Sequence, residues 1–320
     1  MIGDRVLGLA RSLTEHSRKS VARATLALFE HTPYPLENTL DYSGDPGLLG
    51  PNSVSWRLIA DPAAFVGGLR ALLVQAAHPE VVAGVDQHSR YMDDPLGRLS
   101  RTSAYVTATT FGAMPEVEDA LTRVLRAHAR VKGVSSRGRP YDAADPRYSA
   151  WVHNALTDSF LTANQHYSDY PLTVVEADRF VAEQALIGAR LDADPLPSTA
   201  RDLRQWIETH PDITPSPEMT SVVEFLGDPP LSPGVRLGYG LLHAAAVATL
   251  PERIREVLGV RSRPGAVSLG VAAVSGLRWA LGASPSWALA LTRCGVEIPI
   301  GMFRRQPPAS TAPRRDISAI

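Results

Sequence analysis

The sequence predicts an all-α protein that folds as a single large helical domain. Apolar residues recur at spacings of three and four along most of the chain, and Asp-Pro or Thr caps precede several of these stretches. No segment alternates between apolar and polar residues as a half-buried strand does. The chain also lacks an internal repeat at a solenoid period, so we expect about ten or more helices around one core.

The clearest helix signals give the expected order of the elements. Asp61-Pro62 starts a helix that His78-Pro79 ends, because a residue before proline avoids the helical conformation. Thr173 and Glu176 form a capping box at the start of another helix. The predicted helices span residues 63–77, 80–87, 115–132, 146–165, 173–190, 200–209, 217–226, 232–249 and 251–258, with two more within 265–293.

Composition divides the chain into three regions. Residues 1–48 are a helix-prone amphipathic arm followed by a loop, residues 49–300 form the predicted helical domain, and residues 301–320 are predicted to be disordered. The arm would lie over the core or over a partner, and it suggests a homodimer.

Charge and cysteine content exclude several classes of protein. A net charge of −1 gives no general attraction to nucleic acid. The single cysteine, Cys294, excludes a disulfide framework and a cysteine-rich metal site, so we expect a reducing, cytoplasmic location. Arg278 and Pro285 interrupt the apolar run of residues 264–292, so no integral membrane span is expected, although this leaves peripheral association with a membrane open.

One helix carries a histidine on its apolar side. The stretch from Pro115 to Gly133 has proline and acidic residues at its start and glycine at its end, as helices often do. Its apolar stripe consists of Val117, Leu121, Val124, His128 and Val131. His128 therefore stands where a leucine would be expected.

Two explanations of His128 are open. A buried imidazole either bonds to a backbone carbonyl, which geometry alone favours, or binds a metal, most simply the iron of a haem in an apolar slot. His153 lies on the apolar helix 146–165 and is the reserve axial ligand. The phosphate-binding, dinucleotide-binding, serine-hydrolase and zinc-protease motifs are absent, as are the Glu-x-x-His pairs of di-iron bundles.

The stretch from His88 to Thr102 gathers hydrogen-bond donors. Arg98, Arg101 and Thr102 could bind haem propionates or polarise bound oxygen, although a solvated loop paired with nearby aspartates would explain the arginines equally well. His78 is a candidate distal proton shuttle or a simple helix cap, and His88 is the next candidate.

Several blocks of the chain resemble a known family. LLVQAAHPEVVAGVDQHS (72–89), DPLGRLSRT (94–102), RAHARVKG (126–133) and WVH (151–153) are similar to sequences in the family that contains the latex clearing proteins (rubber oxygenases) and the fungal mycophenolic acid pathway oxygenase. The resemblance implies an all-α fold with a globin-like core, haem b, and His128 as the axial ligand.

The resemblance also implies a distal site, with one departure. The rubber oxygenases have a distal Arg-x-x-Lys-Thr stretch, which here runs from Arg98 to Thr102 with Arg101 in place of the lysine. Arginine does not lose its proton to bind iron, so the lysine-closed state and polyisoprene cleavage are not expected. The distal glutamate of the rubber oxygenases has no secure counterpart; Glu80 lies near the right spacing, and His78 is its rival.

We therefore expect a haem b-dependent oxygenase or peroxidase-like oxidoreductase that acts on a small hydrophobic molecule with dioxygen or peroxide. The alternatives are a haem carrier or sensor without turnover, and a helical structural protein without a cofactor. A haem absorption band that disappears in His128→Ala separates these hypotheses.

Overall fold

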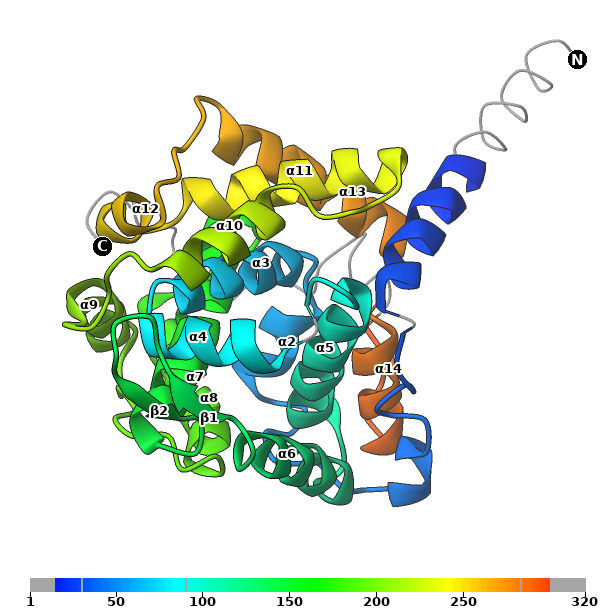
Figure 1. Cartoon of the computed structure of the whole chain (residues 1–320). Helices are drawn as coiled ribbons and strands as arrows, with labels where there is room; N and C mark the ends of the chain where they lie inside the picture. Colours follow the sequence, from blue (N-terminus) through cyan, green and yellow to red (C-terminus); the bar gives the residue numbers. More distant parts are fainter. Residues whose placement is uncertain (1–14, 30, 90, 283, 300–320) are drawn as a thin grey trace, which may run out of the picture.

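A computed structural model confirms the all-α fold (Figure 1). It describes residues 15–29, 31–89, 91–282 and 284–299. Within these ranges the only strands are two of three residues each, and helices form the rest of the regular structure. The predicted disordered tail, residues 301–320, lies outside the described residues, as does the beginning of the predicted arm.

Residues 15–26 are helical and precede the labelled elements. In chain order these are η1 (Ala27–Phe29), η2 (Thr39–Tyr42), α2 (Val54–Ala60), α3 (Ala63–Ala76), α4 (Pro79–His88), α5 (Pro95–Phe111), α6 (Met114–His128), β1 (Lys132–Val134), β2 (Pro140–Asp142), α7 (Pro146–Tyr167), α8 (Val174–Ala189), α9 (Ala200–Thr209), α10 (Pro217–Gly227), α11 (Pro233–Ala248), α12 (Glu252–Leu258), α13 (Ala266–Leu281) and α14 (Pro285–Arg293).

Local capping explains where several helices begin and end. The Thr173 hydroxyl accepts a hydrogen bond from the Glu176 amide, and the Glu176 carboxylate accepts one from Thr173, so the predicted capping box is confirmed. Asp145 caps the start of α7 through the Arg147 amide. Gly259 ends α12 in the left-handed conformation, with φ of 67°.

Helices α3 and α7 cross at the centre of the core. At Gly67 the two backbones approach so closely that an added Cβ would lie 3.0 Å from the Phe160 Cα and 3.2 Å from the Ser159 carbonyl oxygen. Beside this contact, the buried Arg70 guanidinium donates to the Asp158 carboxylate at 2.6 Å and to the Ser159 hydroxyl at 2.8 Å. The crossing is therefore close in its backbone and also fixed by a buried ion pair.

The other helices surround this pair. Helix α3 contacts α2, α4, α10, α11 and α12, and α7 contacts α8, α9 and α13. Figure 1 shows α11 and α13 as an outer layer over α3, and α6 with the small sheet at the opposite end of the molecule. Because α4 follows α3 after only two residues, the central crossing also sets the position of α4.

The predicted helix 115–132 is too long. Helix α6 ends at His128, and the chain turns into β1, which pairs with β2 in antiparallel register with Gly133 opposite Tyr141. A Cβ on Gly133 would lie 2.5 Å from the Tyr141 hydroxyl oxygen. Gly133 is therefore required for a close approach between strands rather than for ending the helix, and strands of three residues are too short to show an alternating pattern.

We predict that Gly67→Ala destabilises the protein although alanine favours helices. The added methyl group meets backbone atoms of α7 that cannot move without shifting that helix, so we expect a loss of about 1–3 kcal/mol in the free energy of unfolding. Gly68→Ala is the matched control, because no atom lies within 4 Å of its added Cβ. The control should gain up to about 1 kcal/mol in urea unfolding. Equal effects of the two substitutions would contradict the close crossing.

Candidate active site

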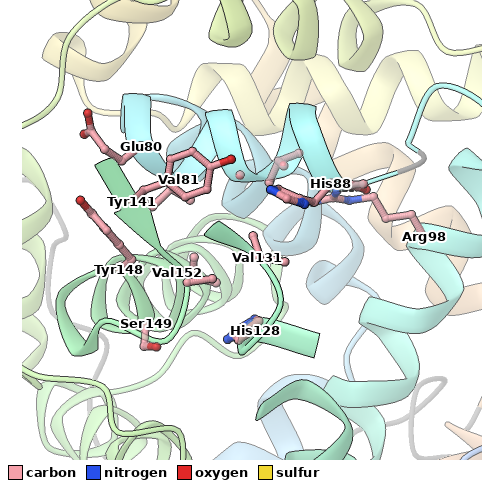
Figure 2. Close-up of a pocket in the computed structure, with 14 residues that line it drawn as sticks. Glu80, Val81, His88, Arg98, His128, Val131, Tyr141, Tyr148, Ser149 and Val152 are labelled. Carbon is pink, nitrogen blue, oxygen red and sulfur yellow. Dashed lines mark hydrogen bonds between the residues drawn. The ribbon is translucent and has the colours of Figure 1, made fainter. Parts of the chain in front are cut away.

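A pocket opens between α4, α5, the end of α6, β2 and α7 (Figure 2). Its interior measures about 190 Å³, and the free space including its open mouth is about 670 Å³. The lining residues are Glu80, Val81, Gly84, Val85, His88, Ser89, Arg98, His128, Val131, Tyr141, Ala143, Tyr148, Ser149 and Val152. The interior alone suits a small ligand, whereas a flat macrocycle would also use the mouth.

His128 lines this pocket at the last residue of α6. Figure 2 shows its ring across the pocket from α4 and His88. Its side chain is half-buried, and burial lowers the pKa of His128 below its ordinary value. Neither ring nitrogen has a hydrogen-bond partner among the described residues. His128 thus presents a neutral imidazole whose nitrogens are not used by the protein, unlike the carbonyl-bonded core histidine that was its alternative.

Arg98 extends into the pocket from α5. Its guanidinium donates to the Ser89 hydroxyl, and burial together with the neighbouring Arg101 lowers the pKa of Arg98. In the part of the chain that the structure describes, no carboxylate lies within ion-pair distance of Arg98. A half-buried cation without a counter-anion favours binding of an anionic group.

His88 also lines the pocket but is hydrogen-bonded to the backbone. One nitrogen of its ring lies 3.1 Å from the Lys132 carbonyl oxygen, which ties the end of α4 to β1. That bond fixes the orientation of the ring. Among the described residues, His88 thus keeps one ring nitrogen free, whereas His128 keeps both.

Glu80 is buried at the rim of the pocket, and its carboxylate accepts hydrogen bonds from neighbouring residues of the protein. The Arg137 guanidinium donates two hydrogen bonds to it and the Ser135 hydroxyl donates one at 2.9 Å. Burial opposes ionisation, but these donors prevail and lower the pKa of Glu80 below its ordinary value. Glu80 is therefore an ionised and tightly held carboxylate.

His78 lies behind Glu80 rather than in the pocket lining. Its ring is buried against Tyr148, Trp151 and His210, and its Nδ1 lies 3.5 Å from a Glu80 carboxylate oxygen without a hydrogen bond. Burial and the nearby His210 lower the pKa of His78 to about 4, so it is neutral at pH 7.

Three of these neighbouring groups could in principle bind a metal. Donor atoms of His78, His210 and Asp212 lie within 4.8 Å of one another. However, Arg139 and Arg137 reach the same Asp212 oxygen, at 3.0 and 3.5 Å, and the His210 Nδ1 accepts a hydrogen bond from the Asp212 amide. Two cations at the only carboxylate of the group disfavour a divalent ion there.

Arg101 and Thr102 do not line the pocket, although they are on the same helix as Arg98. The Arg101 side chain is 54 % exposed and forms an ion pair with Asp94 at 3.1 Å. The Thr102 hydroxyl donates to the Arg98 carbonyl oxygen at 3.1 Å, a bond within the helix.

His153 is a core residue between α7 and α8. Its ring is so close to Gly188 that a Cβ on this glycine would lie 2.7 Å from the His153 Cδ2. Complete burial lowers the pKa of His153 to about 4. The pocket therefore brings together His128, His88 and Arg98 from the predicted set, and leaves His78, His153, Arg101 and Thr102 outside its lining.

Sequence reasoning missed the two tyrosines of the pocket. Tyr148 and Tyr141 both line it, and burial raises the pKa of each phenol. Tyr148 lies on the predicted apolar helix 146–165, where nothing distinguishes it from the other large residues, and Tyr141 lies in the hairpin that the sequence did not predict. In the sequence, the two tyrosines are distinguished only by their position near Asp145-Pro146, and that position does not by itself indicate a binding site.

Comparison with known families identifies the domain. The model of a family described as ER-bound oxygenase mpaB/B'/Rubber oxygenase, catalytic domain, matches residues 56–283. The matched range is more than half of the 320 residues and includes every residue that lines the pocket. The chain belongs to this oxygenase family. The comparisons with curated proteins and with solved structures found no match.

The family assignment makes the pocket the candidate active site of an oxygenase-type enzyme, and it confirms the resemblance seen in the sequence. An oxygenase acts on a small molecule, which fits the size of the pocket interior. No single described helix is long and apolar enough to cross a membrane, while two bent helix pairs pass the same test of length and composition.

We predict that His153 makes the protein less stable in acid. Its folded pKa of about 4 is below the ordinary 6.5, so between these values the unfolded chain binds a proton that the folded chain does not. Stability should therefore fall as the pH falls through this window, by about 2 kcal/mol between pH 7 and pH 5 from His153 alone. Urea unfolding at both pH values measures this difference.

His153→Leu should reduce the pH dependence by that amount, whatever its effect at pH 7. An unaltered pH dependence in His153→Leu would contradict the core assignment of this ring.

Proposed function

We propose that the protein is a haem b-dependent oxygenase or peroxidase-like oxidoreductase, with His128 as the axial ligand of the iron. The observation that carries the proposal is a neutral imidazole that lines the pocket and has no hydrogen-bond partner among the described residues. A metal-binding histidine needs one free nitrogen and a neutral ring, and His128 meets both requirements.

The other lining residues fit the remaining parts of a haem. The Arg98 guanidinium, supported by Ser89, would pair with a propionate, since no carboxylate of the described residues lies within ion-pair distance of it. Val81, Val85 and Val152 supply apolar walls from two helices. The donor set thus fits one cationic anchor, one axial ligand and an apolar slot.

When bound, haem would supply the one-electron and dioxygen chemistry that amino-acid side chains lack. The residues of this chain would exclude water with the valine walls and hold the propionate with Arg98. Burial raises the pKa of Tyr148 and Tyr141, so both phenols stay protonated at pH 7. The Tyr141 hydroxyl already donates to the Gln87 Oε1 at 2.6 Å, whereas the Tyr148 hydroxyl can donate a hydrogen bond to a substrate or co-substrate.

The sequence suggested His78 as a distal proton shuttle, and we propose a different role for it. Glu80 already accepts three hydrogen bonds from Arg137 and Ser135, so it would hold its charge rather than exchange a proton freely. His78 is neutral and contacts both Glu80 and Tyr148. Since no hydrogen bond joins its ring to Tyr148 or Glu80, we infer that His78 would position Tyr148 from behind the pocket rather than deliver protons to a substrate.

The substrate is proposed to be small and largely hydrophobic, with dioxygen or peroxide as co-substrate. The valines of the walls favour apolar groups, and the pocket interior of about 190 Å³ limits the size of a molecule that it can enclose. Arg101 points to Asp94 and solvent, so the lysine-closed state of the rubber oxygenases has no counterpart here. The alternative is a haem carrier without turnover. Purified protein that contains haem but oxidises no substrate would favour this alternative.

We predict that His128→Ala abolishes haem binding. Protein produced with ample haem precursor should show a Soret band, and the variant should lose it, with affinity lowered by more than about 100-fold because an axial bond exceeds the 10–100-fold effect of outer groups. The matched control is His88→Ala, which removes the other histidine of the pocket but should keep the band. Loss of the band only in the control would move the axial assignment to His88, and a wild-type protein without any band would refute haem binding.

We also predict that Arg98 and Arg101 contribute unequally. Arg98→Leu removes a charge-assisted pair with a propionate and should weaken haem binding about 10–100-fold. Arg101→Leu breaks an exposed ion pair with Asp94 and should change haem affinity by no more than about fivefold. Titration of apoprotein with haem measures both values. Equal losses would show that Arg101 reaches the cofactor.

A further inference from the structure

Helix α13 leaves several of its larger apolar residues exposed outside the core. The residues on its buried side are Ala266, Gly270, Val274 and Arg278, whereas its larger apolar residues Val267, Leu269, Val271 and Trp279 are exposed. Leu269 is 55 % exposed and Trp279 is 41 % exposed. A surface helix normally buries its large apolar residues and exposes its polar ones. The exposed apolar residues of α13 are therefore typical of a surface that contacts another molecule.

The inward side of α13 holds the only charge of the helix. The buried Arg278 guanidinium donates to the Asp61 carboxylate at 2.9 Å and to the Tyr167 carbonyl oxygen at 3.0 Å, and it pairs with Asp169 at 3.0 Å. A Cβ on Gly270 would lie 2.6 Å from the Ala245 Cβ and 2.7 Å from Tyr167. These contacts fix the rotation of the helix, so the apolar residues cannot turn inward.

Helix α11 lies beside α13 and extends the same outer layer (Figure 1). Leu237 of α11 is 72 % exposed. We refer to Leu237, Val267, Leu269, Val271 and Trp279 as the α11–α13 face. The sequence contains no Asp or Glu in residues 229–251 or 257–296, which include both helices.

Exposed cations stand at both ends of the α11–α13 face. Arg261 and Arg263 directly precede α13 and are exposed. At the other end, the helix of residues 15–26 contacts α13, because the Arg18 guanidinium donates to the Ala280 carbonyl oxygen at 3.0 Å. This helix exposes Arg23 and Lys19, of which Lys19 is paired with Glu15 at 3.9 Å. An apolar surface with cations at its ends and no acidic residue in its helices complements an anionic lipid surface.

We propose that the α11–α13 face docks onto the surface of an anionic lipid bilayer. Leu269, Val271 and Trp279 would enter the interface between headgroups and acyl chains, where the indole of tryptophan is favoured. Arg261 and Arg263 would lie at the headgroup phosphates, with their aliphatic stems along the apolar surface. The proposed docking is peripheral, because the buried ion pairs of Arg278 hold α13 against the core. No single described helix is long and apolar enough to span a membrane, while α13 and α14 pass the same test only as a bent pair.

A lipid surface fits better than a second copy of the chain. Helices α11 and α13 contain no carboxylate of their own, and the exposed Asp228 beside α11 is already paired with Arg236. A second copy that met these two helices would therefore offer Arg261 and Arg263 no acidic partner from α11 or α13. Lipid phosphates supply those partners. The docking is also independent of haem binding, because none of these residues lines the pocket.

The test is sedimentation of the full-length protein with vesicles. We expect binding to vesicles of phosphatidylcholine that contain about 30 % of the anionic lipid phosphatidylglycerol, and little binding to vesicles of phosphatidylcholine alone. Leu269→Glu should weaken binding by at least about tenfold. Arg261→Gln with Arg263→Gln should weaken it by about thirtyfold, because each cation near the surface contributes about fivefold.

The matched control is Leu186→Glu, which places the same charge on α8 at a leucine that is 51 % exposed. It should bind the vesicles like the wild-type protein. Binding that Leu269→Glu leaves unchanged, or no binding to anionic vesicles, would overturn the proposal. So would a dimer that forms without lipid and dissociates in Leu269→Glu, because that outcome assigns the face to a second copy.

A second measurement places the tryptophan directly. Phospholipids with brominated acyl chains should quench part of the protein fluorescence, and Trp279→Phe should remove the quenched part. Trp56, Trp151 and Trp287 are buried, and the half-buried Trp206 lies on α9 with its ring against Trp151 and His210. Quenching that is unchanged in Trp279→Phe would show that another surface meets the bilayer and would overturn the assignment.

Discussion

The close crossing of α3 and α7 at Gly67 is the constraint on which the rest of the architecture depends. Burying a cation and a carboxylate beside it would be costly without good geometry, and Arg70 and Asp158 meet at 2.6 Å with Ser159 as an additional acceptor. The pair therefore fixes how the two helices rotate relative to one another. Helix α4, which follows α3, and the residues of α7 that face it then form two opposite walls of the pocket.

The electrostatics of the pocket follow from the same arrangement. Hydrogen bonds from Arg137 and Ser135 compensate the negative charge of Glu80 within the protein. The positive charge of Arg98 has no carboxylate partner among the described residues. The pocket therefore has an uncompensated cation on one side and a neutral imidazole, that of His128, on the other. A ligand with an anionic group and an electron-accepting centre would satisfy both, and haem has that combination.

The sequence predicts the parts of this protein that depend on local interactions. Helix α3 follows from Asp61-Pro62 and α8 from its capping box, and the apolar stripe that begins at Val117 correctly indicated the inward side of α6. The end of α6 was not predictable, because it depends on the pairing of β1 with β2 and on the approach of Tyr141 to Gly133. Those contacts join residues that no local pattern connects.

The orientation of the arginines on α5 shows the same limit. Arg98 and Arg101 are three residues apart, so they occupy adjacent positions on the helix surface, and the sequence cannot determine which one faces the pocket. The answer depends on how α5 packs against α4, where the Ser89 hydroxyl meets Arg98, while Asp94 draws Arg101 to the outside.

Helix α13 shows that a buried charge can direct a whole helix outward. Hydrophobic burial alone would favour turning Leu269 and Trp279 toward the core, because each would remove a large apolar area from water. The opposite rotation persists because Arg278 would then lose Asp61 and Asp169, and an unpaired buried charge costs more than a single apolar side chain gains. Gly270 strengthens this preference, since only a residue without a side chain allows α13 to lie so close to Tyr167 and Ala245. The contacts of Arg278 and Gly270 with the core therefore determine that these apolar residues are exposed, which explains how a stable fold can keep large apolar side chains on its surface.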